Sequence, residues 1–177
     1  MPIFLGNLAP VSDLAPVFNL VPVYLGNLAI VIATVAGMEI VAWATHRFVM
    51  HGWGWGWHRS HHEPRNGVFE KNDLYAVLSV GIALALIVWG ARTGGPAYWI
   101  GVGMSVYGVL YFVLHDGLVH HRWPFRIKPR QAYLQRLLQA HHLHHAVRGR
   151  EGAVSFGFLY APPIRRLREK LKGMNRS

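Results

Sequence analysis

Three uninterrupted apolar stretches constrain this chain more than any other feature of its sequence. They cover residues 25–45, 74–91 and 97–114, and the only charged residue within them is Glu39. A bilayer core about 30 Å thick is crossed by about 20 helical residues, and about 18 residues just suffice. The sequence therefore predicts three transmembrane helices, and the short "RTGGP" link between the second and third predicts a helical hairpin.

The positions of the basic residues orient these predicted helices. A net charge of +10 occurs in proteins that bind nucleic acid, but here no Lys or Arg precedes Arg47. Residues 46–73 contain four basic residues and residues 115–177 contain thirteen, whereas the hairpin link contains only Arg92. By the positive-inside rule, the two basic segments lie on the cytoplasmic side. We expect an integral membrane protein whose partner is the lipid bilayer and not a nucleic acid.

The first 24 residues differ from the rest. Prolines at positions 2, 10, 16 and 22 interrupt any regular helix, so we expect residues 1–24 to be an irregular N-terminal extension and residues 25–177 to be a single domain. The extension lacks a positively charged start and is not interpreted as a removable signal peptide. A fourth membrane segment, either here or in "VSFGFLYAPP" at 154–163, stays open. The predicted fold is an all-α membrane bundle of three to four transmembrane helices.

The C-terminal third predicts structure at the membrane surface. The stretch "RQAYLQRLLQAHHLHH", residues 130–145, has apolar residues near helical spacing and predicts an amphipathic surface helix. The stretch at 154–163 is expected either to dip into the membrane or to pack under the helices. The basic tail that begins at Arg165 is expected to be helical.

Histidines supply the chemistry. All 12 lie in the two basic segments, and the chain has no cysteine, so thiolate ligands are excluded. On an α-helix, the pattern His-x-x-His-His in "HRSHH" and "HHLHH" predicts three nitrogens that converge on one volume. Histidines five residues apart, His46 with His51 and His115 with His120, would lie about 140° apart and would serve two metals more easily than one.

The number of histidines predicts a dinuclear site, because one first-row metal ion takes only about four to six ligands. Imidazole suits Zn, Cu, Fe and Ni alike, so spacing leaves the metal open. Two acidic residues are also candidate site residues. Asp116 either orients the imidazole of His115 or lies in water at a helix end, and Glu39 is expected to be a buried partner of a metal ligand or of a neighbouring helix. Glu63 and Glu70 are interpreted as ordinary loop charges.

Three stretches carry a resemblance to a known family. They are "GMEIVAWATHRFVMHGWGWGWHRSHHEPRNGVFEKNDLYAV", "YGVLYFVLHDGLVHHRWPFR" and "AHHLHHAVRGREGAVSFGFLYAPP". With their four histidine motifs in order, they resemble the membrane di-iron hydroxylases of the fatty acid hydroxylase superfamily, and within it the bacterial beta-carotene 3-hydroxylases. The match covers most of residues 37–163 and leaves out the first 24 residues.

This resemblance implies an all-helical iron enzyme of the bacterial inner membrane. It implies two Fe ions, O2 as co-substrate, reduced ferredoxin as electron donor, and hydroxylation of carbon 3 of each beta-ionone ring, from beta-carotene through beta-cryptoxanthin to zeaxanthin. The implied metal ligands are His46, His51, His58, His61, His62, His115, His120, His141, His144 and His145. His121 and His142 stand where the family pattern does not require His, so they are expected beside the site or on the surface.

Other functions stay open at this point. A sterol or fatty-acid hydroxylase or a carotenoid ketolase of the same superfamily would have the same ligands and a different pocket. A membrane metal transporter would need polar groups through the membrane midplane, where the second and third apolar stretches offer only scattered hydroxyls. A b-type haem protein would leave most of the histidines unexplained.

Overall fold

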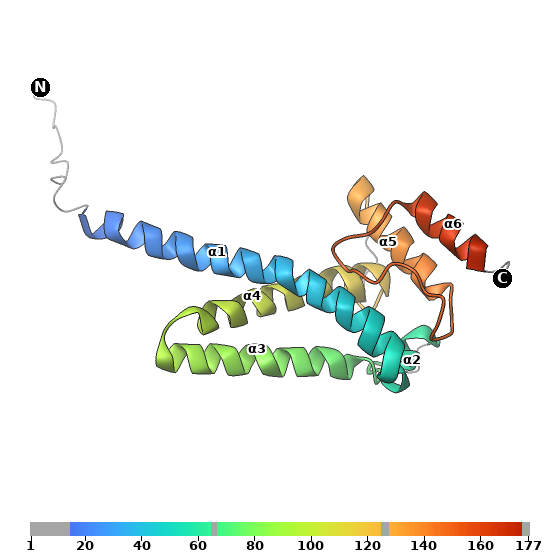
Figure 1. Cartoon of the computed structure of the whole chain (residues 1–177), viewed down its shortest axis with the longest axis horizontal. Helices are drawn as coiled ribbons and strands as arrows, with labels where there is room; N and C mark the ends of the chain where they lie inside the picture. Colours follow the sequence, from blue (N-terminus) through green and yellow to red (C-terminus); the bar gives the residue numbers. More distant parts are fainter. Residues whose placement is uncertain (1–14, 65–66, 125–127, 175–177) are drawn as a thin grey trace, which may run out of the picture.

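The structure, a computed structural model, describes residues 15–64, 67–124 and 128–174, and every regular element in these ranges is a helix (Figure 1). The elements are α1 (Ala15–Ala44), η2 (Thr45–Trp53), α2 (Trp55–His62), α3 (Asp73–Thr93), α4 (Pro96–Tyr111), η3 (Phe112–Val119), α5 (Ala132–His145) and α6 (Ile164–Met174). The predicted all-α fold is confirmed.

Three helical spans are long and apolar enough to cross a membrane, as the sequence predicts. Within the described residues they are Val21–Trp53, Asp73–Thr93 and Pro96–Val119, with 33, 21 and 24 residues. Large apolar side chains such as Ile40, Leu84 and Val109 remain 68%, 55% and 61% exposed on them. An apolar surface of this extent is typical of helices that face lipid.

Close helix packing holds the three spans together. Helices α3 and α4 form the predicted hairpin, and Gly94 and Gly95 turn the chain between them with φ of +74° and +88°, angles that L side chains rarely adopt. A Cβ on Gly103 would lie 2.6 Å from the Cβ of Thr34 in α1, so only glycine lets α4 approach α1 this closely.

The N-terminal region differs from the prediction. Helix α1 begins at Ala15, so the irregular structure expected for residues 1–24 is wrong from residue 15 onward, and residues 1–14 lie outside the described residues. Pro22 lies inside this helix. A proline removes one backbone hydrogen bond, and apolar helices of membrane proteins tolerate this loss where the neighbouring turns stay bonded.

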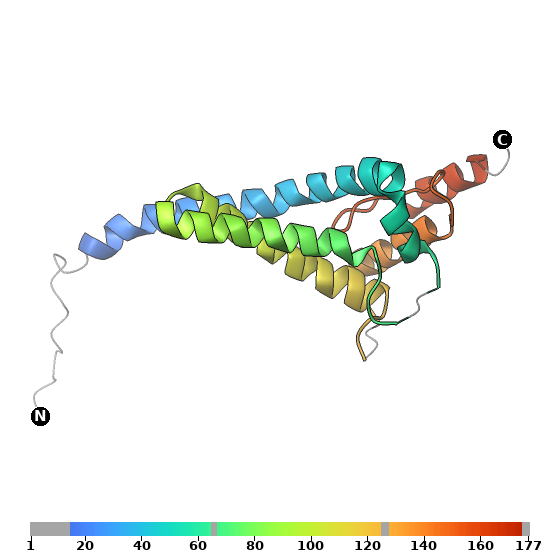
Figure 2. The same ribbon diagram turned by 90° about the horizontal axis from the view of Figure 1, so that it is seen from below.

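The segment at 154–163 packs against helices and forms no fourth membrane helix. It has no regular structure, and its residues Val154 and Ala161 form one core with Leu137 of α5 and Leu167 of α6. In both ribbon views the chain between α5 and α6 passes along the end of α1 (Figures 1 and 2). Of the two alternatives for this segment, packing under the helices is confirmed.

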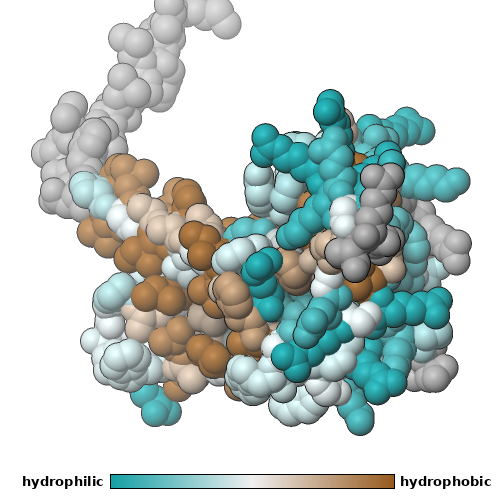
Figure 3. All heavy atoms as spheres, turned by 45° about the vertical axis from the view of Figure 1, so that its right-hand side comes forward, coloured by the Kyte–Doolittle hydropathy of each residue, from teal (hydrophilic) through white to brown (hydrophobic). Residues whose placement is uncertain are grey.

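Polarity divides the molecule into two ends. Apolar residues cover the side formed by the long helices, and hydrophilic residues cover the side that bears α5 and α6 (Figure 3). Both predicted C-terminal helices are present, as α5 and α6. The histidines lie at this hydrophilic end, where the long spans stop.

Candidate metal centre

Two membrane helices change to π-helix where their histidines begin. Helix α1 continues as η2 and α4 continues as η3, and the N–H of His120 donates to the carbonyl of His115, five residues earlier, at 3.0 Å. Bonds between residues five apart place them one turn apart on the same side of the helix. The ring centroids of His46 and His51 are accordingly 5.3 Å apart, and those of His115 and His120 are 4.5 Å apart.

The prediction that these pairs would each serve two metals is therefore wrong. It assumed α-helical geometry, in which residues five apart point in different directions. In the π-helical segments both members of a pair face the same group of histidines. Widened turns of this kind are frequent at functional sites.

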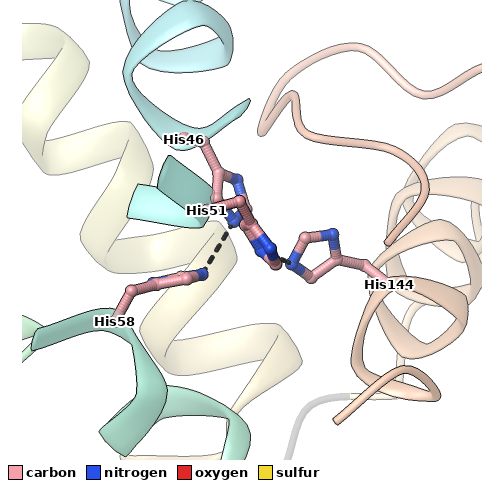
Figure 4. A group of neighbouring side chains, drawn as sticks. All are labelled: His46, His51, His58 and His144. Atoms are coloured by element: carbon pink, nitrogen blue, oxygen red, sulfur yellow. Dashed lines mark hydrogen bonds between the residues drawn. The ribbon is translucent and has the colours of Figure 1, made fainter. Parts of the chain in front are cut away.

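The histidines form two clusters. In the first histidine cluster, one nitrogen from each residue lies within 4.8 Å of the others, and its members are His46, His51, His58 and His144 (Figure 4). The second histidine cluster meets the same limit with His61, His120, His141 and His145. The other two predicted ligands lie at the margins: the Nε2 of His62 is 3.2 Å from that of His58, and the Nε2 of His115 is 3.2 Å from that of His61. The structure thus brings together all the histidines that the sequence analysis named as ligands.

Each His-x-x-His-His motif is divided between the clusters. In α2, His58 and His62 approach the first cluster, and His61 belongs to the second. In α5 the assignment is reversed, since His141 and His145 belong to the second cluster and His144 to the first. The expectation that each motif would converge on one volume is wrong, because residues i+3 and i+4 point about 100° apart and lie on opposite sides of residue i.

The imidazole rings are fixed through their Nδ1 atoms. The Nδ1–H of His46 donates to the Phe156 carbonyl at 2.9 Å, and that of His144 donates to the Val154 carbonyl at 3.0 Å. The Nδ1–H of His58 donates to the Asn72 amide oxygen at 2.7 Å. His51 and His62 are held in the same way by the carbonyls of Arg150 and Val147. Such partners fix both the tautomer and the orientation of a metal-binding imidazole.

The Nε2 atoms then face one another without a proton to share. The Nε2 atoms of His46 and His58 are 3.1 Å apart, and those of His51 and His144 are 3.2 Å apart (Figure 4). Because Nδ1 carries the proton in each ring, both facing atoms are lone-pair acceptors. A cation between them would satisfy these lone pairs, so the donor set fits a metal that prefers imidazole nitrogen.

Burial keeps these imidazoles neutral. Desolvation lowers the pKa of His58 to about 3, that of His62 to about 4 and that of His120 to about 3. Desolvation also moves the pKa of His61, His141 and His144 well below the usual 6.5. A neutral imidazole is the form that binds a metal ion, so the clusters hold their ligands ready for coordination at neutral pH.

The two predicted carboxylates have different partners. Asp116 accepts the Nδ1–H of His115 at 2.8 Å, so it lies where it orients that imidazole. Glu39 accepts the hydroxyl of Tyr107 in α4 at 2.8 Å and the backbone N–H groups of residues 158–160 at 2.9–3.0 Å. Glu39 was expected to partner either a metal ligand or a neighbouring helix, and the structure shows the neighbouring helix. Among the described residues, no hydrogen bond joins Glu39 to a histidine.

Two site residues were missed by the sequence analysis. Glu70, interpreted as a loop charge, accepts the Nδ1–H of His61 at 3.0 Å, and Asn72 holds His58. Both residues lie in the stretch "EKND", immediately before α3 begins. The only sequence signal for their role was an acid and an amide that precede a helix close to the histidines. His121 and His142 are exposed, as expected.

Comparisons with known proteins agree with this geometry. The fatty acid hydroxylase family matches residues 31–162. The chain is 58% identical to a beta-carotene hydroxylase of Pantoea ananas over 84% of this chain and 85% of that protein, and 56% identical to one of Paracoccus sp. (strain PC1) over 81% and 89%. It is 36% identical to the chloroplastic beta-carotene 3-hydroxylase 1 of Arabidopsis thaliana over 77% of this chain and 45% of that protein. No solved structure matches the chain.

Proposed function

Because this chain belongs to the fatty acid hydroxylase family, we propose that it is a membrane enzyme that hydroxylates carbon 3 of the beta-ionone rings of carotenoids. It would convert beta-carotene through beta-cryptoxanthin to zeaxanthin, with O2 as co-substrate and reduced ferredoxin as electron donor. The observation that carries the proposal is the pair of histidine clusters at the end of three membrane helices. Lone-pair Nε2 atoms face one another within the first cluster, and those of His61 and His115 do so at the second.

Two Fe ions are the proposed cofactor, one in each histidine cluster. The proposed ligands are the members of the two clusters together with His62 and His115. Iron supplies redox chemistry with O2 that acid–base side chains and zinc lack, and an unactivated ring C–H bond requires such chemistry.

The chain's own residues orient and protect this centre. The carbonyls of Phe156 and Val154 fix the rings of His46 and His144, and Asp116 fixes the ring of His115. The Phe156 ring also packs against the rings of His46 and His51, with centroids 5.4 Å and 5.3 Å apart. This apolar cover limits the access of water to the first cluster.

The exposed apolar faces of the membrane spans suit a hydrocarbon substrate. A long polyene dissolved in the bilayer would lie along these faces and bring one ring to the metal centre at their end. The substrate would thus reach the metals from the lipid side and the electron donor from the water side.

The basic end of the molecule fits the proposed location in the bacterial inner membrane. With the positive-inside rule, the metal centre lies on the cytoplasmic side. The net charge of +10 would attract an acidic donor such as ferredoxin, and the same charge would also favour anionic lipid.

The decisive experiment is expression in cells that accumulate beta-carotene, followed by liquid chromatography with mass detection of the pigments. We expect beta-cryptoxanthin and zeaxanthin with the parent chain and unchanged beta-carotene with His61→Ala. His142→Ala is the matched control, because His142 is exposed on α5, and it should retain activity. Unchanged beta-carotene despite confirmed membrane expression of the parent chain would contradict the proposal. Ketocarotenoid, sterol and fatty-acid substrates would then be tested.

A further inference from the structure

A groove of about 290 Å³ lies at the C-terminal end of α1, outside the histidine clusters. Trp43 of α1 and Tyr160 form its aromatic side, and Val154 and Phe156 contribute apolar lining. Arg47 of η2 and Arg166 and Lys170 of α6 complete the lining. Its size is close to the lower limit of about 300 Å³ for small-molecule sites. The groove therefore combines an apolar wall with three cations.

These cations have no counter-ion within the described residues. Arg47 lies over the Phe156 ring, 5.3 Å from its centroid, and no ion pair joins Arg47, Arg166 or Lys170 to an acidic residue of the described chain. Glu169, the acidic residue of α6, pairs instead with Arg165 at 2.8 Å. Three cations around one groove favour an anion supplied from outside the chain.

The apolar side of the groove continues onto the lipid-facing surface. Trp43 is 41% exposed, and Ile40, about one turn earlier on the same face of α1, is 68% exposed. Tryptophan and tyrosine are enriched where a membrane protein meets the headgroup layer. A ligand in this groove can thus place a charged group among the cations and an apolar chain along α1.

From this arrangement we propose that the groove binds the headgroup of an anionic phospholipid. The phosphate lies among Arg47, Arg166 and Lys170, and an acyl chain follows the exposed face of α1 past Ile40. A lipid fits better than a soluble phosphate compound because the groove opens onto an apolar membrane face. This site is separate from the proposed hydroxylation chemistry and does not depend on it.

The test uses the full chain in neutral detergent, with dioleoyl phosphatidylglycerol or dioleoyl phosphatidylcholine added in mixed micelles and the bound lipid counted by intact-complex mass spectrometry. We expect phosphatidylglycerol to bind about tenfold more tightly than phosphatidylcholine. The double variant Arg166→Gln/Lys170→Gln should lose about tenfold in affinity for phosphatidylglycerol.

The matched control is Arg168→Gln/Lys172→Gln, which removes the same charge from exposed positions of α6 that do not line the groove. It should retain most of the affinity, and equal losses in both double variants would overturn the proposal in favour of diffuse surface attraction. Displacement of the lipid by equimolar glycerol 3-phosphate would overturn it in favour of a soluble ligand. Unchanged lipid binding in the groove variant, with weaker binding of an acidic ferredoxin, would overturn it in favour of a protein partner.

Discussion

The Nε2 atom of His51 lies 3.2 Å from the Nε2 atom of His144, although the two residues are 93 positions apart. Their Nδ1 atoms donate to the carbonyls of Arg150 and Val154, so both facing nitrogens carry lone pairs. Two acceptors at this distance repel each other unless a proton or a cation lies between them. The contact joins η2 to α5 and makes the fold of this region dependent on what the clusters bind.

The first prediction concerns metal content. We expect the purified chain to bind two iron ions, measured by atomic absorption. His144→Ala should lower both the iron content and the midpoint of thermal unfolding, because it removes a buried ligand that is held by the Val154 carbonyl. His142→Ala, on the exposed side of the same helix, should change neither. Full iron content in the His144 variant would contradict the assignment of this ligand.

The second prediction concerns the hydrogen-bond partner of a proposed ligand. Glu70→Ala removes the acceptor of the His61 Nδ1–H and should weaken metal binding by about 10- to 100-fold. Glu63→Ala provides the control, because among the described residues Glu63 pairs only with exposed Arg59. A metal competition assay would compare the two variants. Equal affinities would show that Glu70 does not support the site.

The third prediction concerns Glu39. Glu39→Ala leaves the N–H groups of residues 158–160 and the Tyr107 hydroxyl without their acceptor, so we expect a loss of about 3 kcal/mol in stability. Tyr107→Phe removes only one of these bonds and should cost about 1 kcal/mol. Thermal unfolding in detergent would measure both. The prediction would be wrong if the two variants unfolded at the same temperature.

The fourth prediction concerns pH. Desolvation lowers the folded-state pKa of His58 and His120 to about 3 and that of His62 to about 4, below the ordinary 6.5. The unfolded chain therefore binds protons that the folded chain does not, and metal-free protein should lose stability as the pH falls from about 6.5 to about 4. Above about pH 7 both states are neutral, so these groups should contribute no pH dependence. Unfolding midpoints measured from pH 8 to pH 4 would reveal a constant stability if the histidines were solvated.

The fifth prediction concerns Ser155, which has a φ of +61°. It stands between Val154 and Phe156, whose carbonyls hold His144 and His46. A β-branched residue is strained at this backbone angle, so Ser155→Val should cost about 1–3 kcal/mol and release metal more readily. Ser155→Gly adopts the angle freely and should keep its metal content. Equal metal retention by both variants would show that this backbone angle does not matter to the site.

Local sequence was enough to predict the membrane helices and a histidine-rich metal site, and the family resemblance supplied the histidines that the structure brings together. The three spans follow from apolar runs, because a helix in lipid must satisfy its backbone internally and needs no distant partner. The sequence also predicts that the histidines gather at one end of the helices. The second and third spans form a hairpin, with Arg92 in the link at one end and the histidines beyond the other end. The irregular structure expected between residues 15 and 24 was wrong because proline was weighed without the apolar context that keeps α1 helical.

The sequence by itself therefore determined an all-helical membrane chain with a histidine-rich end, but it did not determine which histidine faces which cluster. Three features depend on packing between segments distant in the sequence. They are the π-helical segments, the division of each motif between the clusters, and the pairing of His61 with His115. A backbone N–H bonds to the carbonyl four residues earlier in an α-helix and five residues earlier in a π-helix. Which of the two forms here is decided by the partners that the histidine side chains reach. The partner of His46, Phe156, lies 110 residues away, so only the tertiary structure fixes the geometry of the metal centre.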